Sequence, residues 1–203
     1  MTKAEDNLMD WLRDAHAMEE QAEKMLSATA GRLEHYPDLK ARIEQHLEET
    51  RQQARLVREC IERRGGDTSA TKDAMAKMMA MMQGLSGMFV SDEVVKASLV
   101  SYAFEHMEIA SYKALIAGAE VVGDTETKRV CEQILVQEEA MAEWLAEHLH
   151  GTVVKFLARN EAPNTTGMSE ISCLRHNMHS RSDYASQDED PTAGIAGDSS
   201  RTA

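Results

Sequence analysis

Residues 131–145 read CEQILVQEEAMAEWL, and the spacing of their apolar side chains is typical of one face of an α-helix. Glu138 lies inside this apolar stripe, because Ile134 precedes it by four residues and Met141 follows it by three. Burying an ionised carboxylate is costly unless a partner compensates it. The stretch therefore predicts a helix packed against other helices and a polar centre between them.

Three further stretches show the same periodicity, so we expect four long helices. The first runs from about Lys3 to Leu33, the second from the break at Tyr36-Pro37 to Arg63-Arg64-Gly65-Gly66, the third from the cap Ser91-Asp92-Glu93 to about Ala119, and the fourth from Asp124-Thr125-Glu126 through Leu149. Caps, cations near carboxyl ends and glycines mark these boundaries.

The connections between these helices predict the topology. Short links join the first helix to the second and the third to the fourth, whereas residues 65–92 form a long crossover. This order is that of an all-α, ferritin-like four-helix bundle, in which one crossing segment joins two antiparallel hairpins. A connection of this length without regular structure is unusual in a compact domain, so we expect a short extra helix over Thr71–Met88.

The apolar periodicity ends near residue 158, and Ser, Thr, Gly, Asp, Asn and Pro accumulate from there to residue 203. A segment of this composition buries too little apolar surface to compensate the entropy lost on ordering. We therefore expect one ferritin-like domain over residues 1–158 and a disordered polar tail over residues 159–203.

Composition and charge exclude several classes of partner. The formal net charge of −13 repels the phosphate backbone of nucleic acids. No apolar run approaches the roughly 18 residues that span a bilayer, and the first residues lack the apolar core of an export signal. Three cysteines form an odd set that suits a reducing compartment. We expect a cytoplasmic protein that binds neither nucleic acid nor membrane.

The other three expected helices also carry acids on their apolar faces. Glu19 lies inside the stripe of the first helix. His46 and Glu49 share a face of the second helix, and Glu105 and Glu108 lie one turn apart on the third. Lysine and arginine are absent from these faces at the same levels, so bound cations are the expected compensation.

A di-metal centre with bridging and chelating carboxylates explains acids on all four helices. The candidate ligands are Glu19, His46, Glu49, Glu105, Glu108 and Glu138. Coordination by oxygen with at most one imidazole favours iron or manganese over zinc or copper. We therefore expect two ions per bundle, iron or else manganese, with Tyr102 and Tyr112 as nearby hydrogen-bond donors or redox relays.

Two other interpretations stay open. In a chain this acidic, glutamates also fall near the edges of apolar stripes by chance and remain solvated. The protein would then be a non-catalytic helical stress or interaction module without a functional metal centre. The third interpretation is iron storage in a cage, for which the sequence shows no shell-forming interface.

Two segments, His46-Leu-Glu-Glu-Thr50 and Glu105-His-Met-Glu-Ile-Ala-Ser-Tyr112, together with Glu19 and Glu138, resemble the YciE/YciF family of bacterial ferritin-like proteins over roughly residues 7–150. The resemblance implies a rubrerythrin-like bundle, a homodimer and a di-iron or related site. It also implies a stress-associated role, oxidative or osmotic, without a settled reaction, and it does not supply a substrate. The di-metal centre expected from the residues is of an oxidase-like or peroxide-handling kind, for which a small oxidant such as peroxide or O2 is the expected partner.

The sequence departs from the usual di-iron carboxylate pattern, which has Glu-x-x-His on two helices. Glu49 is followed three residues later by Gln52, and Glu138 by Met141. On the second helix the order is reversed, because His46 precedes Glu49. These departures bear on the identity of the metal and on occupancy of the second position.

Overall fold

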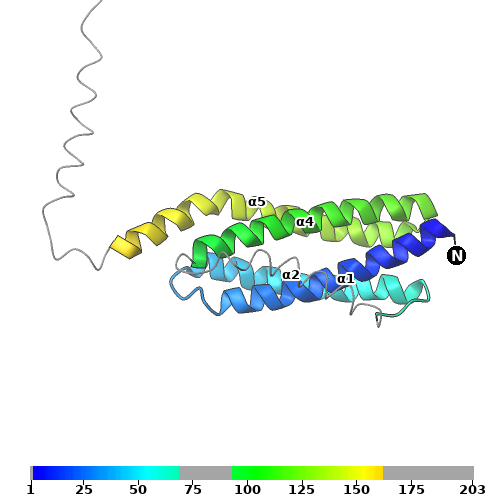
Figure 1. Ribbon diagram of the computed structural model, residues 1–203, viewed down its shortest axis with the longest axis horizontal. Helices are drawn as coiled ribbons and strands as arrows, with labels where there is room; N and C mark the ends of the chain where they lie inside the picture. Colours follow the sequence, from blue (N-terminus) through cyan, green and yellow to red (C-terminus); the bar gives the residue numbers. More distant parts are fainter. Residues whose placement is uncertain (1, 69–92, 162–203) are drawn as a thin grey trace, which may run out of the picture. The chain divides into compact units, whose positions relative to one another are not determined.

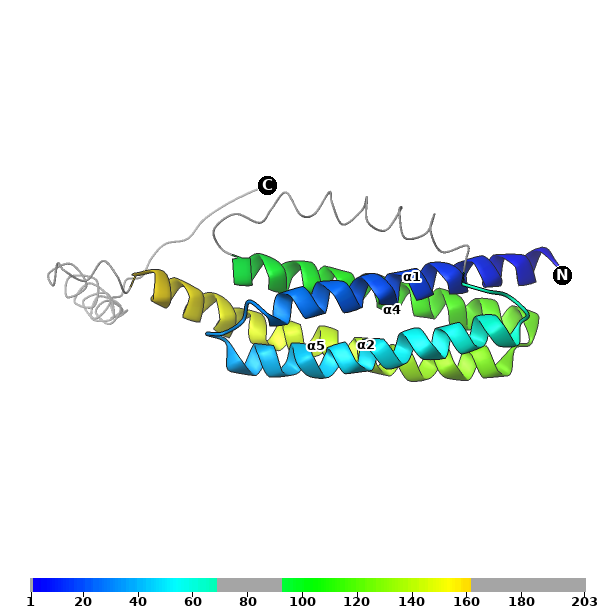
Figure 2. The ribbon, with the colours of Figure 1, turned by 90° about the horizontal axis from the view of Figure 1, so that it is seen from below.

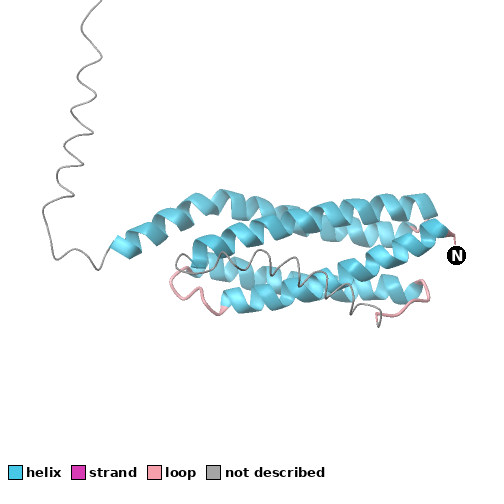
Figure 3. Ribbon diagram, viewed as in Figure 1, coloured by secondary structure: helices cyan, strands magenta, loops and turns pink. Residues whose placement is uncertain are grey.

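The computed structural model describes residues 2–68 and 93–161, and all regular structure within them is α-helical (Figure 3). The helices are α1 (Lys3–Ala30), α2 (Pro37–Arg63), α4 (Glu93–Val122) and α5 (Thr125–Glu161). The predicted all-α class is therefore confirmed. None of the helices in these two ranges combines the length and the apolar character that crossing a bilayer requires.

Local chemistry fixes the helix ends. At the start of α1, the Thr2 hydroxyl accepts the backbone N–H of Glu5 while the Glu5 side chain accepts the backbone N–H of Thr2. Pro37 opens α2 at the position where a missing N–H is harmless. Gly123 has a φ of 74° in the left-handed region, which lets the chain leave α4 and enter α5 after Asp124.

The four helices form two antiparallel hairpins, α1 with α2 and α4 with α5 (Figures 1 and 2). Helix α1 packs against both α2 and α4. Because α2 and α4 run in the same direction, the end of α2 and the start of α4 lie at opposite ends of the bundle (Figure 1). This is the predicted ferritin-like order, in which a long crossover follows the second helix.

Two predictions concern segments that lie partly or wholly outside the described residues. The expected short helix over Thr71–Met88 lies outside the described residues. The expected tail does so from residue 162 onward, whereas residues 159–161 belong to the last turn of α5.

Apolar side chains form two clusters along the bundle. The first includes Leu8, Leu12, Val57, Tyr112 and Ile134, and the second includes Leu26, Leu39, Ile43, Met141 and Leu145. On α2 and α5, the residues between the two clusters include the buried polar side chains of Thr50, Gln53 and Glu138, and the buried His46 lies one residue before Leu47, at the edge of the second cluster. The core therefore has a polar layer between two apolar ones.

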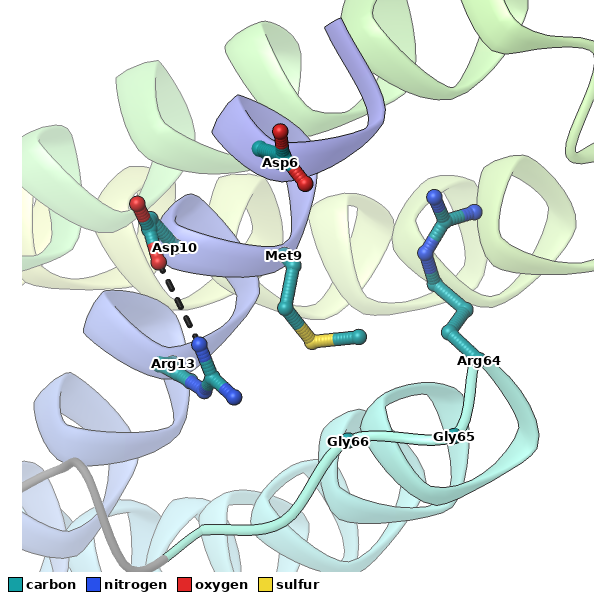
Figure 4. A pocket seen from close by; sticks show the side chains of 7 residues that line it. All are labelled: Asp6, Met9, Asp10, Arg13, Arg64, Gly65 and Gly66. Atoms are coloured by element: carbon teal, nitrogen blue, oxygen red, sulfur yellow. Dashed lines mark hydrogen bonds and ion pairs between the residues drawn. The ribbon is translucent and has the colours of Figure 1, made fainter. Parts of the chain in front are cut away.

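Two glycines carry the chain from the end of α2 against α1 (Figure 4). Gly65 has a φ of 77°, and a Cβ on Gly66 would lie 2.8 Å from the side chain of Met9. Arg13 of α1 then donates from Nε to the carbonyl oxygen of Asp67 at 3.2 Å. A pocket of about 200 Å³ forms at this turn, and none of the candidate ligands lines it.

Candidate metal centre

Four buried side chains from three helices converge in the polar layer. They are His46 of α2, Glu105 and Glu108 of α4, and Glu138 of α5. Each offers one ligand atom, and these atoms all lie within 4.8 Å of one another. Each residue is only 1% exposed, so solvent does not screen the charges. The structure thus brings together four of the six candidate ligands.

The imidazole of His46 has a different neighbour at each nitrogen. Its Nε2 lies 3.1 Å from Glu105 Oε2 and 3.5 Å from Glu138 Oε2. Its Nδ1 lies 2.9 Å from an oxygen of Glu49. In the metal-free centre both ring nitrogens can donate to carboxylates, Nδ1 to Glu49 and Nε2 to Glu105. If a metal displaces the proton of Nε2, Nδ1 still donates to Glu49 and the Nε2 lone pair is directed at the metal, which is the arrangement of a metal-binding histidine.

Glu49 lies on the outer side of the His46 ring and is not one of the converging four. Its side chain is 20% exposed and also accepts from Gln45 at 2.8 Å and from Arg42 at 3.3 Å. Partial burial acts to raise the pKa of Glu49, but the contacts with His46, Gln45 and Arg42 outweigh it and lower the pKa to about 2. Glu49 is therefore a stable anion that orients His46.

Glu19 of α1 adds a fourth buried carboxylate beside the group. Its side chain is fully buried, and one oxygen accepts the hydroxyl of Tyr112. Burial raises the pKa of Glu19 well above its ordinary value, and the charge of Glu138 raises it further. Burial and the neighbouring Glu19 likewise raise the pKa of the Tyr112 hydroxyl, so the phenol stays a hydrogen-bond donor.

The pKa values of Glu105, Glu108 and His46 show that several buried carboxylates lie close to one another. Burial raises the pKa of Glu105 to about 7, even though His46 acts to lower it. Burial also raises the pKa of Glu108 well above its ordinary value, and the charge of Glu138 adds to this effect. Burial alone would lower the pKa of His46, but the surrounding carboxylates hold it well above its usual value.

Several polar atoms at the centre lack a full set of hydrogen-bond partners within the protein. One oxygen of Glu19 is buried without a partner, and one oxygen each of Glu105 and Glu138 lies beside the same nitrogen, Nε2 of His46, which can donate a single hydrogen. Buried polar atoms in folded proteins are almost always paired, so three such oxygens with at most one donor between them indicate an absent partner. Carboxylate oxygens with one imidazole nitrogen form a donor set that suits iron or manganese. The residues present therefore fit a bound metal.

Sequence reasoning did not select Gln53, which the structure places at the centre. Gln53 is fully buried, and its Nε2 donates to Glu138 Oε1 at 2.5 Å and to Gln137 Oε1 at 3.1 Å. The available signal was its spacing, since Gln53 lies two turns after His46 with the buried Thr50 between them.

Of the two tyrosine candidates one lies at the centre, and two further histidines have partners elsewhere. Tyr112 reaches Glu19 as expected, but Tyr102 packs edge-on against His106 with ring centroids 4.6 Å apart. His16 is buried beside Arg58, and His148 stacks on Trp144. His46 is thus the one histidine of the described chain that joins the group of four.

Comparison with known proteins gives one family and several solved structures. The family described as "Domain of unknown function (DUF892)" matches residues 3–158. A crystal structure of a protein from Xanthomonas campestris is 45% identical, with a TM-score of 0.67, covering 78% of this chain and 99% of that one.

Two more distant structures share the fold. YcfI from Rhodopseudomonas palustris is 26% identical, with a TM-score of 0.62, covering 72% of this chain and 94% of its own. The Escherichia coli stress protein YciF is 23% identical, with a TM-score of 0.61, covering 76% of this chain and 99% of its own. At that identity the YciF match supports the fold alone.

Proposed function

Since the chain belongs to the DUF892 family, as its match over residues 3–158 shows, we propose that it is a ferritin-like metal-binding protein with two ions in its polar layer. The predicted relationship to YciE/YciF-like proteins is confirmed. The observation that carries the proposal is the set of buried carboxylate oxygens in this layer, of which those of Glu105 and Glu138 share Nε2 of His46 and one of Glu19 has no partner.

Charge gives the number of ions. The carboxyl groups of Glu19, Glu105, Glu108 and Glu138 are each at most 1% exposed. Fully ionised, they carry four negative charges, which two divalent cations neutralise. Among the described residues, His46 is the basic side chain that contacts Glu105 and Glu138, whereas Arg42 pairs with Glu49 on the outer side. Iron or manganese suits the oxygen-rich donor set.

The chain's own residues prepare this centre in three ways. Glu49 holds Nδ1 of His46 and so fixes the direction of Nε2. Tyr112 holds one oxygen of Glu19 and leaves the other free. The two apolar clusters on either side exclude water, which strengthens every charge interaction in the layer. Bound iron or manganese would supply Lewis acidity and redox chemistry toward a small oxidant such as peroxide or O2.

The biological setting that we propose is a response to oxidative or osmotic stress, in a homodimer. The support is the fold shared with YciF, which is named as a stress protein of Escherichia coli. Size-exclusion chromatography with light scattering distinguishes the dimer from a monomer and from a storage cage. Growth of a deletion strain under peroxide and under high salt tests the two kinds of stress.

Metal content of the purified full chain tests the central proposal. We expect about two ions per chain in the wild type after loading with Fe²⁺ or Mn²⁺, and a loss of at least one ion in Glu138→Ala. Glu49→Ala should keep the site but weaken binding about 10- to 100-fold, as expected when a partner of a ligating histidine is removed. Glu139→Ala, at the exposed neighbour that pairs with Lys113, is the matched control.

Thermal unfolding with and without chelator separates this proposal from a helical module that functions without metal. A tightly bound metal stabilises the folded state by about 4 kcal/mol at a thousand-fold excess over Kd. We therefore expect a fall in Tm on the order of 10 °C when the metal is removed. Negligible metal in the wild type, together with a Tm unaffected by chelator, would overturn the proposal.

A further inference from the structure

Gln53 is a neutral residue in a layer of acids, and only the nitrogen of its side-chain amide forms hydrogen bonds. Both hydrogens of its amide are used, one by Glu138 and one by Gln137, both on α5. Its carbonyl oxygen is buried and has no hydrogen-bond partner. Because the donors are engaged toward α5, the amide is oriented and its oxygen is left as an unused ligand atom.

Gln53 and His46 hold the two oxygens of one carboxylate. Gln53 Nε2 contacts Glu138 Oε1, whereas His46 Nε2 lies 3.5 Å from Glu138 Oε2. The two α2 residues are seven positions apart, about 10 Å along the helix axis. Glu138 thus lies between two side chains of the same helix, with an imidazole nitrogen beside one of its oxygens and an amide nitrogen beside the other.

We propose that Gln53 is a residue of the metal centre that supplies a neutral oxygen donor and thereby sets the preference of the centre for divalent ions. The proposal rests on the function proposed above and goes one step further. Four buried carboxylates balance two divalent ions. A fifth carboxylate at position 53 would leave one negative charge in excess, which a trivalent ion would neutralise.

A change of one charge at this position gives a direct test. In the full-length protein, Gln53→Glu keeps the shape of the side chain and adds a carboxylate. We expect the affinity for Ga³⁺ relative to Mn²⁺ to rise at least tenfold over the wild type, because an added buried charge acts more strongly on the trivalent ion. Ga³⁺ is used because it carries the charge of Fe³⁺ without redox activity, so binding is measured without turnover.

Gln53→Met provides a second, independent readout. Methionine keeps the length of the side chain but removes both the hydrogen bonds to α5 and the oxygen donor. We expect Mn²⁺ binding to weaken about 10- to 100-fold, or the stoichiometry to fall from two ions to one. This variant adds no buried charge, so it tests the proposal even where Gln53→Glu lowers the stability of the metal-free bundle.

Gln52→Glu is the matched control, because Gln52 is the exposed neighbour that accepts from Arg55 on the outer face of α2. It adds the same charge outside the layer and should change neither metal affinity nor the ratio. Wild-type binding of Mn²⁺ with no change in either Gln53 variant would overturn the role of Gln53 and leave the metal centre standing. No binding of Mn²⁺ or Ga³⁺ by the wild type would overturn both.

Discussion

Two groups of acids in this bundle differ in whether the protein supplies partners for their negative charge. At the turn between α4 and α5, Asp124 accepts the backbone N–H of Thr127 at 3.0 Å and Nη1 of Arg64 at 2.7 Å. Arg63 adds a second cation at 3.3 Å. Burial acts to raise the pKa of Asp124, but the contacts with Thr127 and the two arginines outweigh it and lower the pKa to about 2.

The central layer has acids without such partners. Burial raises the pKa of Glu105 to about 7 and that of Glu108 well above its ordinary value. At the turn, two arginines and a backbone N–H stabilise the charge of Asp124. In the centre, several carboxylates share one imidazole, and buried oxygens remain without a full set of partners. An internal ion pair has its counterion within the protein, whereas a metal site needs a bound cation to neutralise its acids.

The largest effect that tests this contrast is the change from acid to amide at Glu108. In chelator-treated protein at pH 7.5, we expect Glu108→Gln to raise the free energy of unfolding by about 3 kcal/mol. At this pH the buried carboxyl either carries a charge without a counterion or takes up a proton that the unfolded chain has released, and the amide avoids both costs. Urea denaturation measures the change, with Glu139→Gln as the exposed control. A loss of stability in the metal-free Glu108→Gln variant would contradict this account of the layer.

Much of the centre could be predicted from spacing alone. Apolar residues three and four positions from Glu138 predict its burial, and the structure places it 1% exposed between the two apolar clusters. Glu105 and Glu108 were identified in the same way on α4. The predicted burial of these acids is confirmed, because helical periodicity fixes which side chains share a face before any packing is known.

Helix α2 shows where this reasoning stops. From His46, a residue three positions on is rotated by about 60° around the helix, whereas one seven positions on is rotated by only about 20°. Gln53 therefore stays aligned with His46, and Glu49 turns outward. Residue type favours Glu49 as a metal ligand over Gln53, whereas the rotation around the helix favours Gln53. Choosing between them needs the position of α5, which supplies Glu138 and Gln137 to the amide.

The second prediction concerns pH and the metal-free centre. The folded state holds the proton of Glu105 up to about pH 7, whereas the unfolded chain releases it near the ordinary value of 4.5. Between these values the folded state binds more protons, so the free energy of unfolding falls as pH rises. We expect chelator-treated protein to be about 2 kcal/mol more stable at pH 5 than at pH 7.5.

Two comparisons sharpen this pH prediction. Glu105→Gln should flatten the dependence, because the titrating group is gone, whereas Glu139→Gln should leave it unchanged. Metal-loaded protein should show the opposite slope below neutrality, since protons compete with the metal for the carboxylates. Equal slopes in the loaded and metal-free forms would show that these carboxyls do not hold the metal.

The smallest effect is expected at Asp124, with the opposite sign. The folded pKa of about 2 lies below the ordinary value of 3.8, so the ionised carboxylate stabilises the fold above pH 4 and loses this contribution as pH falls toward 2. Asp124→Asn keeps an oxygen for the N–H of Thr127 but removes the charge that holds the arginines. We expect it to lower the free energy of unfolding by about 1 kcal/mol at pH 7.

The difference between Asp124→Asn and the wild type should shrink as pH falls from 4 to 2, which urea denaturation at several pH values measures. Asp10→Asn, at the exposed pair with Arg13, is the control and should have no measurable effect. The same replacement of an acid by an amide thus destabilises the turn and stabilises the metal-free centre. If both variants shifted stability in the same direction, the distinction between a carboxylate held by the protein and one reserved for a metal would fail.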